Sequence, residues 1–282
     1  MNIEKFAISL ASTLPNGRPS PDGAPWVYIT GASDRMALAG IYRDLALGPL
    51  GWVASWSHDG RMDESTTMVD DNPLALPDSA AAREALNWIR RTEPEWLVNH
   101  SIRSFLFARL LARHRGMRPG VDYDTELLFL TCVLHDLGLT DEGNGSQRFE
   151  VDGADLAAKF VAARGFETGA VDMVWRAIAL HTSFGIAERC GTLCALLHGG
   201  TVIDITARGS EFISDAEAQL IHDAYPRRSA VRGLLGAIGD QVAVRPEKGP
   251  MMTLPAELAR LRSVNELTHL ENQMIAASRW GS

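Results

Sequence analysis

The sequence predicts an all-α fold with about eight to ten helices. From Leu76 onwards, apolar residues recur at spacings of three and four, which is typical of helices with one buried face. Several segments are apolar almost all round, as fully buried helices are. No segment shows the run of alternating apolar and polar residues that indicates strands. Hydrophobic residues make up 46% of the chain, so it can bury a sizeable core.

The regular helical pattern covers only part of the chain. Residues 14–25 are rich in Pro, Gly and Asn, which indicates a loop. Residues 36–52 are expected to hold one short helix that ends near Gly48–Pro49. We therefore expect three parts, namely an irregular N-terminal extension, a main helical domain and a helical tail, over residues 1–75, 76–250 and 251–282.

The first two helices of the main domain flank Pro94. Residues 76–91 carry apolar side chains along one stripe, and Asp78 is a candidate N-cap. Residues 95–116 form the second helix, which carries His100 among apolar neighbours.

The later helices follow from the same spacing. A segment that is apolar almost all round ends in the dipeptide His135–Asp136, and a second buried segment ends on His181. Another apolar helix holds Asp204 near its C-terminal end. The expected ranges are 124–136, 148–165, 171–183, 191–209, 214–225, 230–242 and, as one long helix or two short ones, 254–280.

Composition limits the partners and the compartment. The net charge is −8 and no run of Lys or Arg is longer than a pair, which argues against nucleic-acid binding. No stretch approaches the roughly 18–20 apolar residues that span a bilayer, and the N-terminus does not resemble a secretory signal, so we expect a cytoplasmic protein without a membrane partner. The cysteines are expected to be buried free thiols, because two ligands four residues apart do not make a structural zinc site: Cys132, Cys190 and Cys194.

Polar residues on apolar helices are the candidates for chemistry. Two imidazoles and two carboxylates, His100, His135, Asp136 and Asp204, form the ligand set that a divalent metal needs. Each residue also has a structural alternative: a core histidine for His100, helix caps for the dipeptide, and pairing with Arg208 for Asp204. A buried carboxylate is costly unless it is paired or binds a cation, which favours the metal interpretation. The other histidines are expected to be structural or exposed: His58, His114, His198, His222 and His269.

The ordered set of His, then His-Asp, then a distal Asp resembles the HD-domain superfamily of metal-dependent all-α hydrolases. The segments NHSIRSFLFA, TCVLHDLGLT, IALHTSFGIA and GDQVAVRPEKG look like its cyanamide hydratase branch, over roughly residues 76–250. The resemblance implies an HD-domain helical bundle that binds one divalent metal ion. Zinc is favoured, with iron and manganese as alternatives, and the implied ligands are His100, His135, Asp136 and Asp204.

Two departures from the superfamily patterns limit which of its reactions are expected for this chain. Many HD phosphohydrolases have a lysine that contacts phosphate where this chain has Leu139. The sequence has no histidine between Asp136 and His181, which favours one metal and argues against di-iron oxygen chemistry.

The resemblance suggests hydration of the C≡N bond of cyanamide or a similar small nitrile by metal-activated water, giving urea or an amide. His181 is expected to carry a proton, because a histidine that titrates near the working pH suits this role. Glu150 either assists His181 or is a solvated residue of a first helical turn. Arg103 either steadies the substrate or pairs with an acid. Thr182 and Ser183 are expected to cap a helix.

Two alternative functions stay open at this point. One is a phosphohydrolase in which Arg103, Arg148 or Arg227–Arg228 replaces the missing lysine. The other is a metal-stabilised binding protein without turnover. A homodimer is also compatible with the sequence, since many soluble enzymes are symmetric oligomers.

Overall fold

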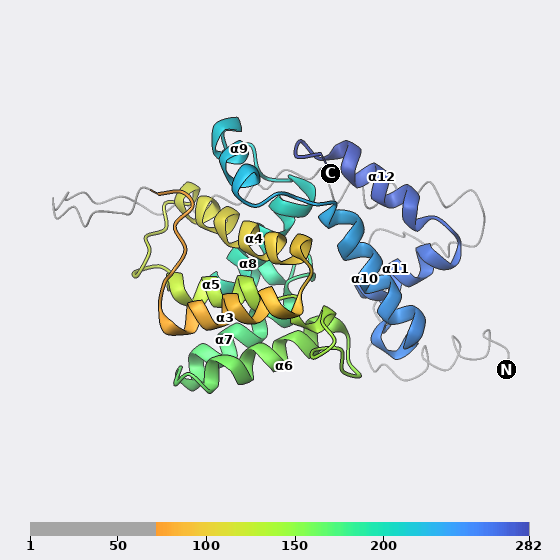
Figure 1. Cartoon of the computed structure of the whole chain (residues 1–282), viewed down its shortest axis with the longest axis horizontal. Helices are drawn as coiled ribbons and strands as arrows, with labels where there is room; N and C mark the ends of the chain where they lie inside the picture. Colours follow the sequence, from red (N-terminus) through yellow and green to blue (C-terminus); the bar gives the residue numbers. More distant parts are fainter. Residues whose placement is uncertain (1–71, 282) are drawn as a thin grey trace, which may run out of the picture. The chain divides into compact units, whose positions relative to one another are not determined.

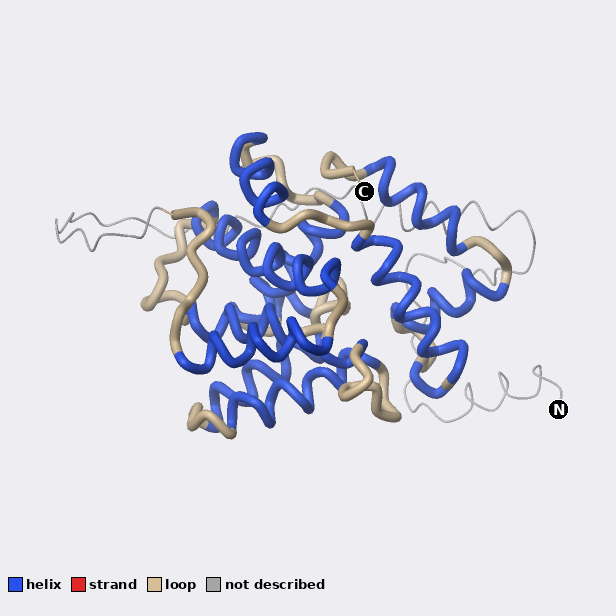
Figure 2. Tube along the Cα trace, in the orientation of Figure 1, coloured by secondary structure: helices blue, strands red, loops and turns tan. Residues whose placement is uncertain are grey.

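The computed structural model describes residues 72–281, and the expected loop and short helix of the N-terminal extension lie outside this range. The described part contains ten α-helices, three short 3-10 helices and no strand (Figure 2). The prediction of an all-α fold is therefore confirmed. The residues described all lie in one compact unit, Met62–Ser282, and the division at residue 250 stays a prediction.

Helices α3 (Ala80–Thr92) and α4 (Glu95–His114) are separated by Glu93 and Pro94. Proline disfavours helical geometry in the residue before it, and Glu93 is accordingly extended, with φ −109° and ψ 146°. The N-cap of α3 is Ser79, whose side chain accepts a hydrogen bond from the backbone N–H of Ala82. The prediction of Asp78 as this cap is wrong, because the Asp78 carboxylate instead pairs with an arginine on the surface.

Helix α5 (Thr125–Leu134) is the most apolar helix, and every residue from Leu127 to Leu134 is buried. Its C-cap is His135, after which Asp136 leads into the 3-10 helix η2 (Leu137–Leu139).

The turn after α5 packs against the start of α6 (Phe149–Ala162), which pairs with α7 (Thr168–Leu180). Gly138 makes this approach possible, because a Cβ at that position would lie 1.9 Å from the carbonyl oxygen of Phe149. The backbone of the His-Asp turn is thereby fixed against the first residues of α6.

Helix α8 (Thr192–Thr206) contacts α4, α5 and α7 and lies at the centre of this bundle (Figure 1). It approaches α4 closely at Gly200, where a Cβ would lie 2.2 Å from the carbonyl oxygen of Ser104. The close approach brings Asp204, one turn further along α8, to the same level as the first turns of α4.

The C-terminal helices form a second hydrophobic cluster. Helices α10 (Ala230–Val244), α11 (Leu254–Ser263) and α12 (Leu267–Ala277) bury their apolar residues together with Phe149 and Ile205. The tail is therefore two short helices, one of the two arrangements expected. Helix α9 (Asp215–Ala224) opens with a capping box, and η3 (Ala187–Arg189) and η4 (Pro246–Lys248) are single 3-10 turns.

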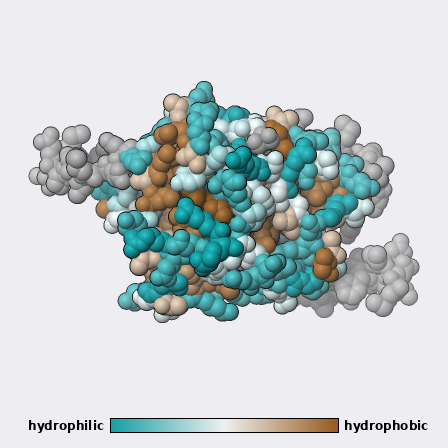
Figure 3. All heavy atoms as spheres, in the orientation of Figure 1, coloured by the Kyte–Doolittle hydropathy of each residue, from teal (hydrophilic) through white to brown (hydrophobic). Residues whose placement is uncertain are grey.

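The surface is that of a helical bundle with polar side chains outside. On the face shown in Figure 3, hydrophilic residues cover much of the described surface and hydrophobic residues gather in separate patches. Among the helices of residues 72–281, none is long and apolar enough to cross a membrane.

Candidate metal centre

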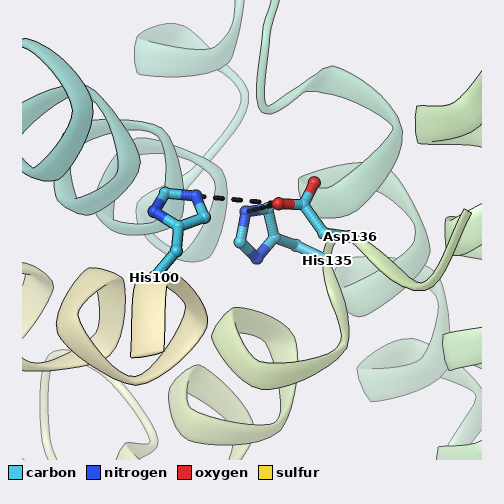
Figure 4. Close-up of side chains that lie close together, drawn as sticks. All are labelled: His100, His135 and Asp136. Atoms are coloured by element: carbon cyan, nitrogen blue, oxygen red, sulfur yellow. Dashed lines mark ion pairs between the residues drawn. The ribbon is translucent and has the colours of Figure 1, made fainter. Parts of the chain in front are cut away.

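Three of the predicted ligands meet between α4 and the end of α5 (Figure 4). His100 comes from the second turn of α4, while His135 and Asp136 follow the last residue of α5. One carboxylate oxygen of Asp136, Oδ2, lies 3.1 Å from His135 Nε2 and 3.6 Å from His100 Nε2. One ligand atom from each residue lies within 4.8 Å of the others, and each side chain is only 1% exposed.

His181 lies beside this group. It is the C-cap of α7, and its Nε2 atom is 3.8 Å from Asp136 Oδ1. Its ring meets that of His135 edge to face, with 4.9 Å between the ring centroids. The structure thus brings together four of the residues singled out in the sequence.

The hydrogen bonds of the three imidazoles fix their tautomers. Nδ1 of His135 lies 2.7 Å from the carbonyl oxygen of Cys132, and Nδ1 of His181 lies 2.7 Å from that of Ile178. A carbonyl only accepts, so both Nδ1 atoms donate. His100 Nδ1 donates in the same way to a carboxylate. In the neutral rings, each Nε2 therefore presents a lone pair towards Asp136, as in metal-ligating histidines.

The Asp136 carboxylate has no hydrogen-bond donor of its own. Both oxygens are buried and lack a hydrogen-bond partner in the described structure. Burial raises the pKa of Asp136, but the neighbouring His135 outweighs burial and holds that pKa well below its usual range. When the rings are neutral, the carboxylate and the imidazole Nε2 lone pairs that face it are all acceptors, and a bound cation would satisfy them. These residues fit a divalent metal ion.

This environment shifts the pKa values of the three imidazoles in different directions. Burial lowers the pKa of His100, and it lowers the pKa of His181 to about 4 with a further contribution from His135. Burial also acts to lower the pKa of His135, but the adjacent Asp136 charge raises it above its ordinary value. His181 is thus neutral at pH 7, which differs from the expectation that it titrates near the working pH.

Asp204 lies behind His100 rather than in the three-residue group. Its Oδ2 atom accepts from His100 Nδ1 at 2.6 Å, and Arg103 donates to both carboxylate oxygens, at 2.7 and 2.8 Å. In this geometry Asp204 orients His100, while the opposite nitrogen of the ring faces Asp136. Direct ligation of a metal by Asp204 stays a prediction that these contacts do not support.

Arg103 pairs with an acid, which is one of the two roles expected for it. Its guanidinium is fully buried, and the donors not used by Asp204 reach the carbonyl oxygens of Tyr225 and Pro226. A second arginine, Arg227, donates to the backbone and side chain of Asp204. Since Arg103 is occupied by protein groups, these contacts support its pairing with an acid and not a contact with substrate.

Glu150 is fully buried, so the alternative of a solvated residue is wrong. Arg148 donates to both of its carboxylate oxygens, at 2.6 and 3.0 Å, and Thr182 donates to Oε1 at 2.6 Å. Because Thr182 directly follows His181, this network ties the start of α6 to the end of α7. Its geometry supports a positioning role for Glu150.

Residues outside the predicted site are mostly structural, as expected. His198 is buried and donates from Nδ1 to the carbonyl oxygen of His181, and the ring of His114 stacks on Phe212. The three cysteines are free thiols, of which Cys132 and Cys194 are buried and the third is half-buried.

One buried acid between α3 and α4 was missed in the sequence. Glu93 lies at the junction of α3 and α4 and is 8% exposed, with neither oxygen hydrogen-bonded in the described structure. A glutamate directly before a proline is typical of a helix boundary, so only its burial in the fold shows that Glu93 is unusual.

Comparison with known proteins agrees with the geometry. The family model for the HD domain matches residues 97–224, a range that includes all the predicted site residues. Two curated proteins of Saccharomyces cerevisiae, the cyanamide hydratases DDI2 and DDI3, are each 29% identical to this chain over 154 residues, which is 54% of this chain and 68% of theirs. Residues 97–224 thus match the HD domain, and the chain is similar to these two cyanamide hydratases over about half of its length.

Proposed function

We propose that this protein adds water to the C≡N bond of cyanamide or a similar small nitrile, giving urea or the corresponding amide. The observation that carries the proposal is the Asp136 carboxylate, buried, unpartnered and faced by three imidazole Nε2 atoms. The similarity to two cyanamide hydratases supports the substrate class.

The surroundings of the site favour a small uncharged substrate over a phosphate. Leu139 stands where many HD phosphohydrolases have a lysine. The arginines that could replace it are each paired with a carboxylate: Arg103 and Arg227 with Asp204, Arg148 with Glu150, and Arg228 with Glu95. Nearly complete burial of the ligand side chains also suits a substrate of few atoms.

In this proposal His100, His135 and Asp136 hold one divalent ion, with zinc favoured and iron or manganese as alternatives. When bound, such an ion lowers the pKa of a water molecule and so supplies a nucleophile at neutral pH. Addition forms one C–O bond and breaks one C–N π bond, and both protons of the water end on the nitrogen. The Nε2 lone pair of His181 accepts the first of these protons. Glu150, through Thr182, keeps His181 in place.

The test is to incubate the metal-loaded protein with cyanamide and to measure urea. We expect turnover by the wild type and only background urea from Asp136→Ala and His135→Ala, while the exposed neighbour variant Asp141→Ala stays active. If zinc, iron and manganese all fail to support urea formation by the wild type, this substrate is rejected. Phosphate release from a nucleotide panel, dependent on Asp136, would favour a phosphohydrolase instead.

A further inference from the structure

The connector between α9 and α10, residues 225–229, follows an unusual backbone path. Two consecutive residues, Arg228 and Ser229, have positive φ angles of 50° and 61°. The left-handed conformation is unfavourable for residues other than glycine, and it persists only where the surrounding structure holds it. Strained backbone of this kind is concentrated at catalytic and binding sites. The contacts of the connector lead to the metal centre.

Side chains on both sides of His100 hold this connector. Asn99 precedes His100 in α4, and its Nδ2 atom donates to the carbonyl oxygen of Pro226 at 2.9 Å. Arg103 lies about one turn later on the same helix, and its Nη1 atom donates to the carbonyl oxygens of Tyr225 and Pro226 at 3.0 and 3.2 Å. The connector is therefore fastened to the turn of α4 that carries His100.

Arg227 extends from the connector to the carboxylate that orients His100. Its Nη1 atom donates to the main-chain carbonyl oxygen of Asp204 at 2.7 Å and lies 3.3 Å from Oδ1 of the same residue. One nitrogen that reaches both the backbone and the side chain of Asp204 fixes the carboxylate relative to its own helix. The other carboxylate oxygen, Oδ2, accepts from His100 Nδ1 at 2.6 Å, and both Asp204 and Arg227 are buried.

These contacts form a closed ring around His100. Helix α4 holds the connector, the connector holds Asp204 through Arg227, and Asp204 returns to α4 at His100. The adjacent arginine has different surroundings, because the side chain of Arg228 is 59% exposed and pairs with Glu95 at the surface. The connector thus directs one arginine into the fold and the next one outwards.

We propose that Arg227 is a positioning residue of the metal centre, which sets the direction of the His100 ring through Asp204. The inference rests on the part of the proposed function that makes His100 a metal ligand, and it does not depend on the substrate. Groups that orient a ligating histidine fix its tautomer and tune the metal affinity. Arg227 lies beyond the range matched by the HD-domain model, which ends at residue 224.

The zinc affinity of Arg227→Met tests this role, measured on the full-length protein by competition with a chromophoric chelator. Methionine keeps a long unbranched side chain but donates no hydrogen bond, so the Asp204 carboxylate is held less firmly. We expect the dissociation constant for zinc to rise about tenfold. Arg228→Met is the matched control, because it makes the same change in the adjacent residue at the surface, and it should bind zinc as tightly as wild type.

A second measurement follows the His100 ring directly. In the metal-free protein, the proton on His100 Nδ1 lies in a hydrogen bond of 2.6 Å and should give a downfield NMR signal, assigned by its loss in Asp204→Ala. Arg227→Met should shift this signal, and Arg228→Met should leave it in place.

Arg227→Lys is the milder variant should methionine prevent folding. Lysine keeps the positive charge but lacks the planar, fixed geometry of the guanidinium. Arg227→Lys should bind zinc more weakly than Arg228→Lys, which makes the same change one residue along the chain.

The outcomes distinguish this inference from the proposed function. If the folded Arg227 variant binds zinc within twofold of its Arg228 counterpart, the positioning role is overturned and the metal centre stands. An unchanged His100 signal in Arg227→Met would assign Arg227 a structural role and also overturn the inference. A wild type that binds zinc but forms no urea refutes the substrate alone. If the wild type binds no zinc, iron or manganese, the metal centre and this inference fail together.

Discussion

Replacing Asp204 by alanine is expected to destabilise the protein strongly, because the carboxylate neutralises a buried arginine. Both Asp204 and Arg103 are fully buried and share two hydrogen bonds of 2.7 and 2.8 Å. In Asp204→Ala, the guanidinium would keep only the carbonyl oxygens of Tyr225 and Pro226. A buried charge would then lack a counter-charge.

Removing one partner of a buried ion pair costs about 3–5 kcal/mol. For a domain of this size, roughly 2–4 °C of melting temperature is lost per kcal/mol, so Asp204→Ala should melt roughly 6–20 °C below wild type. The same change removes the acceptor of His100 Nδ1, and loss of such a partner lowers metal affinity about 10–100-fold.

Chemical denaturation and calorimetry measure the first effect, and titration of the metal-free protein with zinc measures the second. Asp78→Ala is the control, because it removes the aspartate of an exposed pair with Arg83, a pair worth less than about 1 kcal/mol. If Asp204→Ala is no less stable than Asp78→Ala, the buried pair does not contribute as the geometry requires. If zinc affinity is unchanged, the orienting role of Asp204 is refuted.

Three further predictions concern the frame of the site. Gly138→Ala should destabilise by about 1–3 kcal/mol in denaturant unfolding, because its Cβ would collide with the Phe149 carbonyl; unchanged stability would contradict the packing. Lys248→Met should lower the free energy of unfolding by about 3 kcal/mol, because it leaves the buried Asp152 carboxylate unpaired. Lys248 also donates to the carbonyl oxygen of Gly145, so proteolysis of the variant should cut near Gly145. The paired arginine holds the pKa of Asp204 far below its usual value. The Asp204 carboxylate therefore stabilises the fold above about pH 4, and this contribution is lost as the pH falls further. The unfolding free energies of wild type and Asp204→Asn should converge on acidification.

Local sequence patterns predicted the helices and the centre of the site. Apolar spacing located α5, and the dipeptide His135–Asp136 at its end is the pair that the structure places opposite His100. These features depend on residues close together in the chain, for which periodicity and chain breaks suffice.

The partners of the site residues could not be predicted in the same way. Arg103 and Asp204 lie 101 positions apart, and they meet because α8 approaches α4 closely at Gly200. Such a pairing depends on how two helices pack, which no local pattern encodes. For the same reason the sequence presented Glu93 as a helix boundary, although the fold buries it.

The metal content of the purified protein tests the account most directly. After loading with zinc and removal of free metal, elemental analysis of the wild type should give about one ion per chain. Asp136→Ala should give none, while circular dichroism shows that it keeps its helices. A wild type that retains no metal, or an Asp136→Ala variant that retains as much as wild type, would contradict the assignment of His100, His135 and Asp136 as a metal centre.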